Sequence, residues 1–260
     1  MTLRNLKSAL LTLLAVVVVC VSAQTAVAKE AAPKKTENNI TGMWLLWVKD
    51  GQSAKFEAAI KQYAAWRKRE GDPFSWSVYK PIVGSDLGYY VVRSEGHTWS
   101  EIQAEETWDQ AHTNDASGSH LGEYVSREAH YFSQDDNPHT HWTPSKDYMY
   151  FSVTTYHFIP GTGATVRSVL DKVQKAVSDA KWPYSYSISY LIGGKGGMDI
   201  VEPMKSLEGM AESKPSMMEV LAKSLGGKKA AQALMQKFGT SIKSHDYTIY
   251  QYRPDLTDQN

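Results

Sequence analysis

The stretch PYSYSISYLIGGKGGMDIVEP at residues 183–203 has the same plan as FSWSVYKPIVGSDLGYYVVRS at residues 74–94. In each stretch, two runs rich in aromatic and β-branched residues flank a short turn. Ser85-Asp86 stands in the turn of the earlier stretch, and Gly193–Gly197 forms the turn of the later one. Because Gly and Asp suit tight turns, each stretch predicts a β-hairpin.

A strand and an amphipathic helix precede each hairpin. The predicted strands are residues 43–48 and 148–158, which end at Asp50-Gly51 and Pro160-Gly161. Apolar residues at helical spacing then predict one helix in each half, the first of them behind a cap at Ser53.

A helical region and a last strand follow each hairpin. Thr98-Trp99-Ser100-Glu101 and Ser216-Met217-Met218-Glu219 both have the spacing of a capping box. The helical region of the first half continues around Leu121–Val125, and the last strands are expected around residues 139–143 and 246–252.

The order strand, helix, strand, strand, helix, strand therefore occurs twice, in residues 43–144 and 145–260. Two unrelated domains would be the alternative, but the matching lengths, hairpin positions and terminal prolines favour a duplication. This order is that of a ferredoxin-like unit, whose antiparallel sheet carries helices on one face only. We expect an α+β protein of two tandem ferredoxin-like repeats with their antiparallel sheets packed face to face.

The first residues have the pattern of a secretory signal peptide. Arg4 and Lys7 precede an apolar run at residues 9–21, and Ala26-Val27-Ala28 fits the small-residue cleavage rule. An uncleaved membrane anchor is the alternative, but the run is shorter than the ~20 residues that span a bilayer. We expect residues 1–28 to be a signal peptide, residues 29–42 a flexible leader, and the protein to be periplasmic or secreted.

Composition limits the partners. Cys20, the only cysteine, lies in the signal segment, so the mature chain has no disulfide and no thiolate metal site. The full chain has 28 basic and 28 acidic residues; cleavage would remove Arg4 and Lys7 and leave a net charge of −2. We therefore expect no nucleic-acid partner and no stable membrane anchor after cleavage, while the oligomeric state is open.

Tyrosine, serine and threonine alternate with other residues along three predicted strands of the second half. Side chains on a strand point alternately to its two faces. We expect the apolar sets to meet the helices and the Tyr, Ser and Thr sets to line a space between the sheets, where a flat, partly apolar ligand would fit. The alternative places these tyrosines at the rim with their hydroxyls in solvent. The ligand-binding candidates are Trp76, Trp142, Tyr150, Tyr156, Tyr186, Tyr190 and Tyr250.

Three histidines are the catalytic candidates. If His139 and His141 lie on a strand, both imidazoles point to one face, and His157 on the first strand of the second half is a third neighbour. The alternative is a solvent-edge pair after a polar loop. Since a metal site needs three or four ligands, no metal is assigned. His130 is expected in a helical segment.

With this repeat order and these Tyr-rich strands, residues 43–254 resemble the dimeric α/β-barrel superfamily in a tandem, single-chain form. That superfamily includes cofactor-independent monooxygenases, haem-degrading enzymes and chlorite dismutase-like haem proteins. The resemblance implies a proximal haem histidine on a helix of the second unit, but that half holds only His157 and His245, both on predicted strands. We therefore predict no cofactor.

Three functions remain open. The first is an exported protein that binds a small, partly aromatic or hydrophobic molecule between its two sheets. The second is a cofactor-independent monooxygenase-like enzyme, in which a histidine or tyrosine would manage a proton. The third is an envelope interaction protein without a ligand. Whether the protein is an enzyme is not decided by the sequence, since no catalytic motif stands in it.

Overall fold

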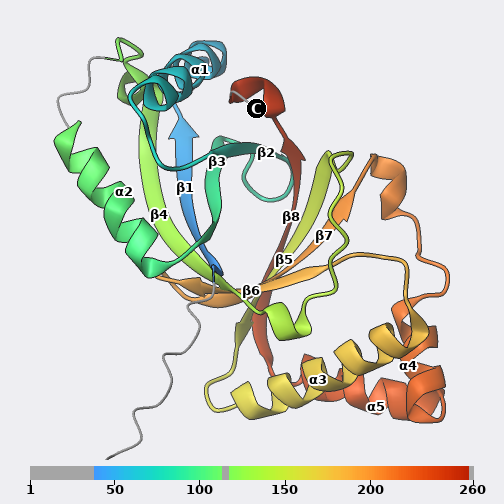
Figure 1. Ribbon diagram of the computed structural model, residues 1–260. Helices are drawn as coiled ribbons and strands as arrows, with labels where there is room; N and C mark the ends of the chain where they lie inside the picture. The colour runs from blue at the N-terminus through green and yellow to red at the C-terminus, as the bar shows by residue number, and fades with distance from the viewer. Residues whose placement is uncertain (1–37, 113–116, 258–260) are drawn as a thin grey trace, which may run out of the picture. The chain divides into compact units, whose positions relative to one another are not determined.

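The computed structural model describes residues 38–112 and 117–257, and eight strands within them form one closed antiparallel barrel (Figure 1). Around the barrel the strands follow the order β1-β3-β2-β8-β5-β7-β6-β4. They are β1 Ile40–Val48, β2 Ser77–Val83, β3 Tyr89–His97, β4 Val125–Asp135, β5 Tyr150–Phe158, β6 Ser187–Ile192, β7 Gly197–Met204 and β8 Ile242–Tyr252. The α+β class is confirmed.

Each half of the chain supplies four neighbouring strands. The first half contributes β4-β1-β3-β2, and the second contributes β6-β7-β5-β8. The halves are hydrogen-bonded to each other at both edges, with Tyr79 of β2 opposite Tyr252 of β8 and Phe132 of β4 opposite Ile192 of β6. Since closure removes every free edge, one face of each sheet is enclosed inside the barrel.

The two predicted hairpins are present as β2–β3 and β6–β7. The second needs glycine at a defined place. Gly194 has φ +56°, and a Cβ on it would lie 2.5 Å from the Tyr131 ring. A larger residue would therefore meet both the backbone penalty and a clash with β4.

Helices cover the outer face of the barrel (Figure 1). They are α1 Ser53–Arg69, α2 Trp99–Ala111, α3 Gly163–Ala180, α4 Met217–Leu225 and α5 Lys228–Gly239. Short 3-10 turns are η1 Leu121–Tyr124, η2 Asn137–His139, η3 Leu207–Met210 and η4 Pro254–Leu256. None of the helices in the described part of the chain combines the length and apolar character that a membrane crossing needs.

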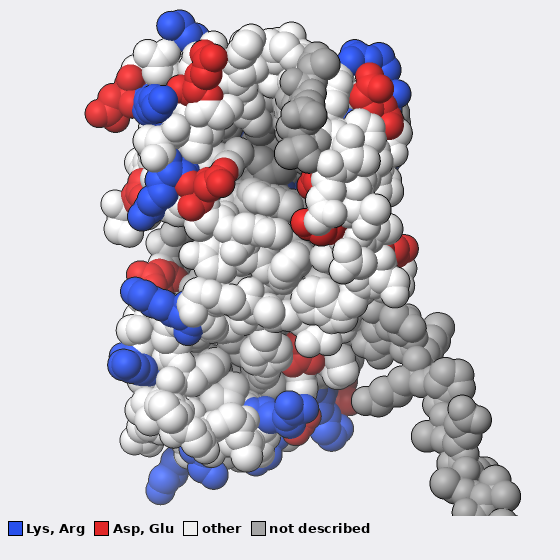
Figure 2. Space-filling view, turned by 90° about the vertical axis from the view of Figure 1, so that its left-hand side faces the viewer, with Lys and Arg blue, Asp and Glu red and all other residues white. Residues whose placement is uncertain are grey.

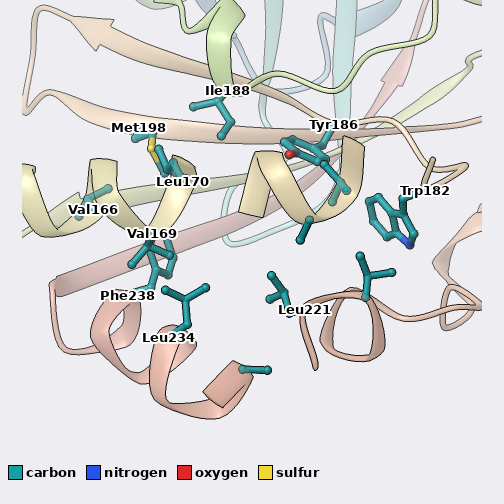
Figure 3. Packing of buried hydrophobic residues seen from close by; sticks show 14 residues of the cluster. Val166, Val169, Leu170, Trp182, Tyr186, Ile188, Met198, Leu221, Leu234 and Phe238 are labelled. Carbon is teal, nitrogen blue, oxygen red and sulfur yellow. The ribbon is translucent and has the colours of Figure 1, made fainter. Parts of the chain in front are cut away.

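The helix layer over the second half is densely packed. Val166, Val169 and Leu170 of α3 are at most 5% exposed and follow helical spacing, so they present one apolar face to the sheet. Leu221 of α4 and Phe238 of α5 close the same cluster from below (Figure 3).

The helix layer over the first half is looser. Phe56 and Ile60 of α1 pack on the outer face of the sheet against Val78, Tyr90 and Val92. Helix α2 contributes no residue to this cluster, and its one buried residue is the charged Glu105. A space therefore remains between α1, α2 and the sheet.

Several local predictions are wrong. The last strand of the first half is β4, not residues 139–143, and it contains His130, which was expected in a helix. Charged residues on both faces of β4 remove the alternation that identifies a strand. Strand β1 begins at Ile40, inside the predicted leader, and α1 has no side-chain cap at its start. The predicted signal peptide, and the leader up to residue 37, lie outside the described residues.

Candidate functional site: the barrel interior

The inward side chains of all eight strands enclose a cavity of about 680 Å³. One lining residue from each strand, in chain order, is Leu45, Tyr79, Val91, Ala129, Val153, Leu191, Val201 and Tyr250. A second cavity of about 890 Å³ opens toward the other end of the barrel. Tyr79, Arg93, Phe151 and Val201 line both cavities, so these four residues form the waist between them.

Arg93 is the cation at this waist. Its side chain is 23% exposed, and because it lines both cavities the exposed part faces the interior. Nε of Arg93 lies 3.3 Å from Oε1 of Glu95, yet this buried nitrogen has no hydrogen bond within the described part of the chain. Arg93 thus places a buried, unsatisfied donor at the waist between the two cavities.

Two carboxyl groups besides Glu95 lie within electrostatic reach of Arg93. Burial raises the pKa of Asp199, although a 2.6 Å hydrogen bond donated by the Thr155 hydroxyl and the charge of Arg93 oppose the shift. Burial also raises the pKa of Asp135 to about 6, and Arg93 opposes this shift as well. Burial and the charge of Arg93 thus act in opposite directions on these two acids, and burial is the larger effect.

Tyrosine hydroxyls and one histidine complete the polar lining. The hydroxyls of Tyr250 and Tyr89 are 2.8 Å apart, and burial raises the pKa of both groups. His157 lines the same cavity, with Nε2 3.7 Å from Oδ2 of Asp246. This arrangement offers a phenol donor and an imidazole to an interior molecule.

Of the seven ligand-binding candidates, Tyr250 lines the interior cavity, and Trp142, 37% exposed, lines the second cavity. The expected orientation is wrong for Tyr156, Tyr186 and Tyr190, which pack into the helix-side core. Tyr150 lies on the same face of β5 as Tyr156, because residues an even number of positions apart share a face. Trp76 lies outside the barrel, beside α1.

Among the histidine candidates, only His157 faces the interior. His139 ends η2 and lies between Asp136 and Asp171, at 2.8 and 2.9 Å. His141 forms an isolated bridge with Tyr186, and its ring contacts the backbone oxygen of Trp182. The expected strand pair is therefore wrong, and the described residues contain no cluster of three or more His, Cys, Asp or Glu suited to a metal.

Sequence reasoning missed Arg93 and Asp199. A usable signal was present, because each is the single charge within a short run of otherwise uncharged, largely apolar or aromatic residues, YYVVRS and GMDIV. A charge at such a position is seldom buried without a partner or a role.

A separate cavity of about 760 Å³ lies outside the barrel, between α1, α2 and the first-half sheet. Its walls include the rings of Trp44, Trp76 and Trp108. Arg67, 5% exposed, pairs there with Asp72, Glu105 and Asp109. This guanidinium already has three carboxylate partners, unlike that of Arg93.

No family model matches the sequence, and no curated protein matches it. Several solved structures are similar to this chain in fold. An anthrone oxidase-like protein is 10% identical with a TM-score of 0.50, covering 83% of this chain and 92% of its own. A putative monooxygenase from Lactobacillus acidophilus is 7% identical with a TM-score of 0.51, covering 84% and 94%. A chlorite dismutase variant from Candidatus Nitrospira defluvii is 11% identical with a TM-score of 0.49, covering 86% of this chain and 94% of its own.

These structural neighbours are dimeric α/β-barrel proteins. At such identities the likeness concerns the fold alone. The chain described here therefore has the eight-stranded antiparallel barrel with outer helices that this group of structures shares.

Proposed function

We propose that this chain is an exported protein that binds a small, partly aromatic or hydrophobic molecule inside its barrel. The observation that carries the proposal is the interior cavity of about 680 Å³, lined from all eight strands. Its size lies within the ~300–1,000 Å³ of small-molecule sites, and its lining joins many apolar groups to a few convergent polar ones.

Mass spectrometry under native conditions tests this proposal on protein isolated from its own host. We expect a small molecule to co-purify with the wild-type chain. Ala129→Trp fills the cavity from the inner face of β4 and should abolish this retention. Ser126→Trp adds the same bulk at an exposed position of the same strand and should leave the retention unchanged. Equal retention by both variants would contradict an interior site.

The proposal also includes that the chain is exported and that its two halves arose by duplication. Both halves have the strand order fourth, first, third, second, which is expected if two ferredoxin-like units of one origin close the barrel. Mass measurement of the exported chain should place its first residue at Lys29, and a chain that still begins at Met1 would contradict the signal peptide. The absence of a nucleic-acid partner stays a prediction.

A second candidate function is that of a cofactor-independent oxygenase. Asp199 and His157 face one cavity, and either could accept a proton from a phenolic substrate. The resulting electron-rich ring would supply the electrons to O₂, with one oxygen atom entering the product and the other leaving as water. The names of the structural neighbours, monooxygenase and anthrone oxidase-like, belong to those proteins and only suggest this test.

Oxygen consumption with a dihydroxyaromatic substrate separates the two functions. An enzyme should consume O₂, and His157→Gln and Asp199→Asn should reduce the rate at least tenfold. Binding without oxygen consumption would contradict the oxygenase and leave the binding protein.

A further inference from the structure

Among the described residues, the guanidinium of Arg93 has one ion-pair partner and a buried nitrogen that makes no hydrogen bond. Its one ionic contact is to Glu95, whose own side chain is 53% exposed. Nε of Arg93 is buried and has no hydrogen-bond partner in the described part of the chain. A desolvated guanidinium with five donors is costly unless an anion or several acceptors face it.

The carboxyl groups of Asp199 and Asp135 are the other acidic groups that act on Arg93, and each meets a competing demand. Asp199 already accepts a hydrogen bond from Thr155 at 2.6 Å. Burial raises the pKa of Asp135 and of Asp199, so it acts against their charged forms. Nε of Arg93 is a buried donor at the waist that both cavities share, and it has no acceptor in the described part of the chain.

Apolar groups surround the same place. The rings of Tyr79 and Phe151 lie 5.4 Å apart, nearly perpendicular to each other, and Val201 joins them at the waist. A flat hydrocarbon body fits against these residues, and a planar carboxylate matches the fork of a guanidinium through two parallel hydrogen bonds.

We propose that Arg93 recognises the carboxylate of an aromatic or similarly apolar acid, which lies at the waist of the barrel with its hydrocarbon body against Phe151 and Tyr79. This inference rests on the proposed function, since it names the class of molecule that the interior takes. It assigns Arg93 as a binding residue and sets the orientation of the ligand.

Calorimetric titration with two probes of equal shape tests the inference. 2-Naphthoate carries the acid, and 2-naphthamide replaces it with a neutral group. We expect wild-type protein to bind the naphthoate about 10- to 100-fold more tightly, the range for hydrogen bonds to a charged partner. Ala129→Trp should prevent binding of both probes, which places them in the interior.

Variants at Arg93 assign the preference to one side chain. Arg93→Gln should remove the preference and leave 2-naphthamide binding within about threefold, because only the charged hydrogen bonds are lost. Arg93→Lys keeps the charge without the fork and should lie between the two. Arg69→Gln is the matched control and should keep the preference, since Arg69 lies on α1, outside the barrel, with its side chain 66% exposed.

Each outcome has a definite meaning. Equal affinity of wild-type protein for both probes, or full naphthoate preference in Arg93→Gln, would overturn the acid-binding role and leave the interior site in place. Failure of both probes to bind would overturn the interior as an aromatic site together with this inference. The comparison of 2-naphthoate with 2-naphthamide on wild-type protein tests the preference for an acid even if an Arg93 variant does not fold.

Discussion

At the scale of single residues, three charged groups of the interior, Arg93, Asp135 and Asp199, depend on one another. Arg93 lowers the pKa of Asp135 and Asp199, while burial raises both, and burial is the larger effect. Stability should therefore respond to pH through these two interior acids rather than through surface pairs, which contribute little.

Asp135 allows this to be measured. Its pKa is raised by burial from 3.8 to about 6, so the folded chain holds a proton that the unfolded chain releases between these values. The stabilisation is fully present below pH ~4 and is lost as pH rises through about 6. Asp135→Asn keeps the neutral shape at every pH and should gain stability relative to wild type on going from pH 4 to pH 7, by at most about 3 kcal/mol.

Urea denaturation of both proteins at pH 4 and pH 7 measures the free energies of unfolding. The same difference between variant and wild type at both pH values would contradict a raised pKa for Asp135. A larger advantage of the variant at pH 4 would give the opposite sign and would contradict burial as the cause.

At the scale of elements, the sequence predicted correctly those features that depend on neighbouring residues, such as the starts of helices. The capping boxes at Thr98 and Ser216 are both present, each with the backbone N–H three residues later donating to the hydroxyl. Strand β4 could not be predicted in the same way, because Arg127 and Glu128 place charges on both of its faces. Its pairing with β1 and β6 is decided by contacts distant in sequence.

The two caps should each contribute independently, and by a similar amount, to the free energy of unfolding. Thr98→Ala and Ser216→Ala each remove one side-chain acceptor at the start of a helix, and each should lower the free energy of unfolding by about 1 kcal/mol. Thr107→Ala in the exposed interior of α2 is the control and should have little or no destabilising effect. Urea denaturation measures all three. A cap variant as stable as Thr107→Ala would contradict the capping role.

At the scale of the whole molecule, closure of the barrel explains which part of the site escaped sequence reasoning. Both faces of each strand are covered, one by helices and one by the opposite sheet, so polarity does not tell the two faces apart. On β5 the apolar Phe151 and Val153 face inward, while Tyr156 faces the helices. On β6 the serine Ser189 faces inward and Tyr190 outward.

Figure 2 turns the left side of Figure 1 toward the viewer, and charged side chains of both signs lie mainly along the margins of the described part of this face, while its centre is largely uncharged. The interior cavity persists only if the surrounding barrel is held as one unit, which the β2–β8 and β4–β6 ladders make possible.

These two ladders predict that the halves unfold together. Leu221 is fully buried among the helices of the second half, so Leu221→Ala should lower the free energy of unfolding by about 2–5 kcal/mol. Tryptophan fluorescence reports mainly on the first half, which holds Trp44, Trp66 and Trp76 among others. In one cooperative barrel, Leu221→Ala should shift the fluorescence midpoint in urea as much as the far-ultraviolet circular dichroism midpoint. Met218→Ala on the exposed side of α4 should shift neither. A fluorescence transition that stays in place while the dichroism transition moves would mean that the first half folds without the second, and the enclosed interior would then not depend on both.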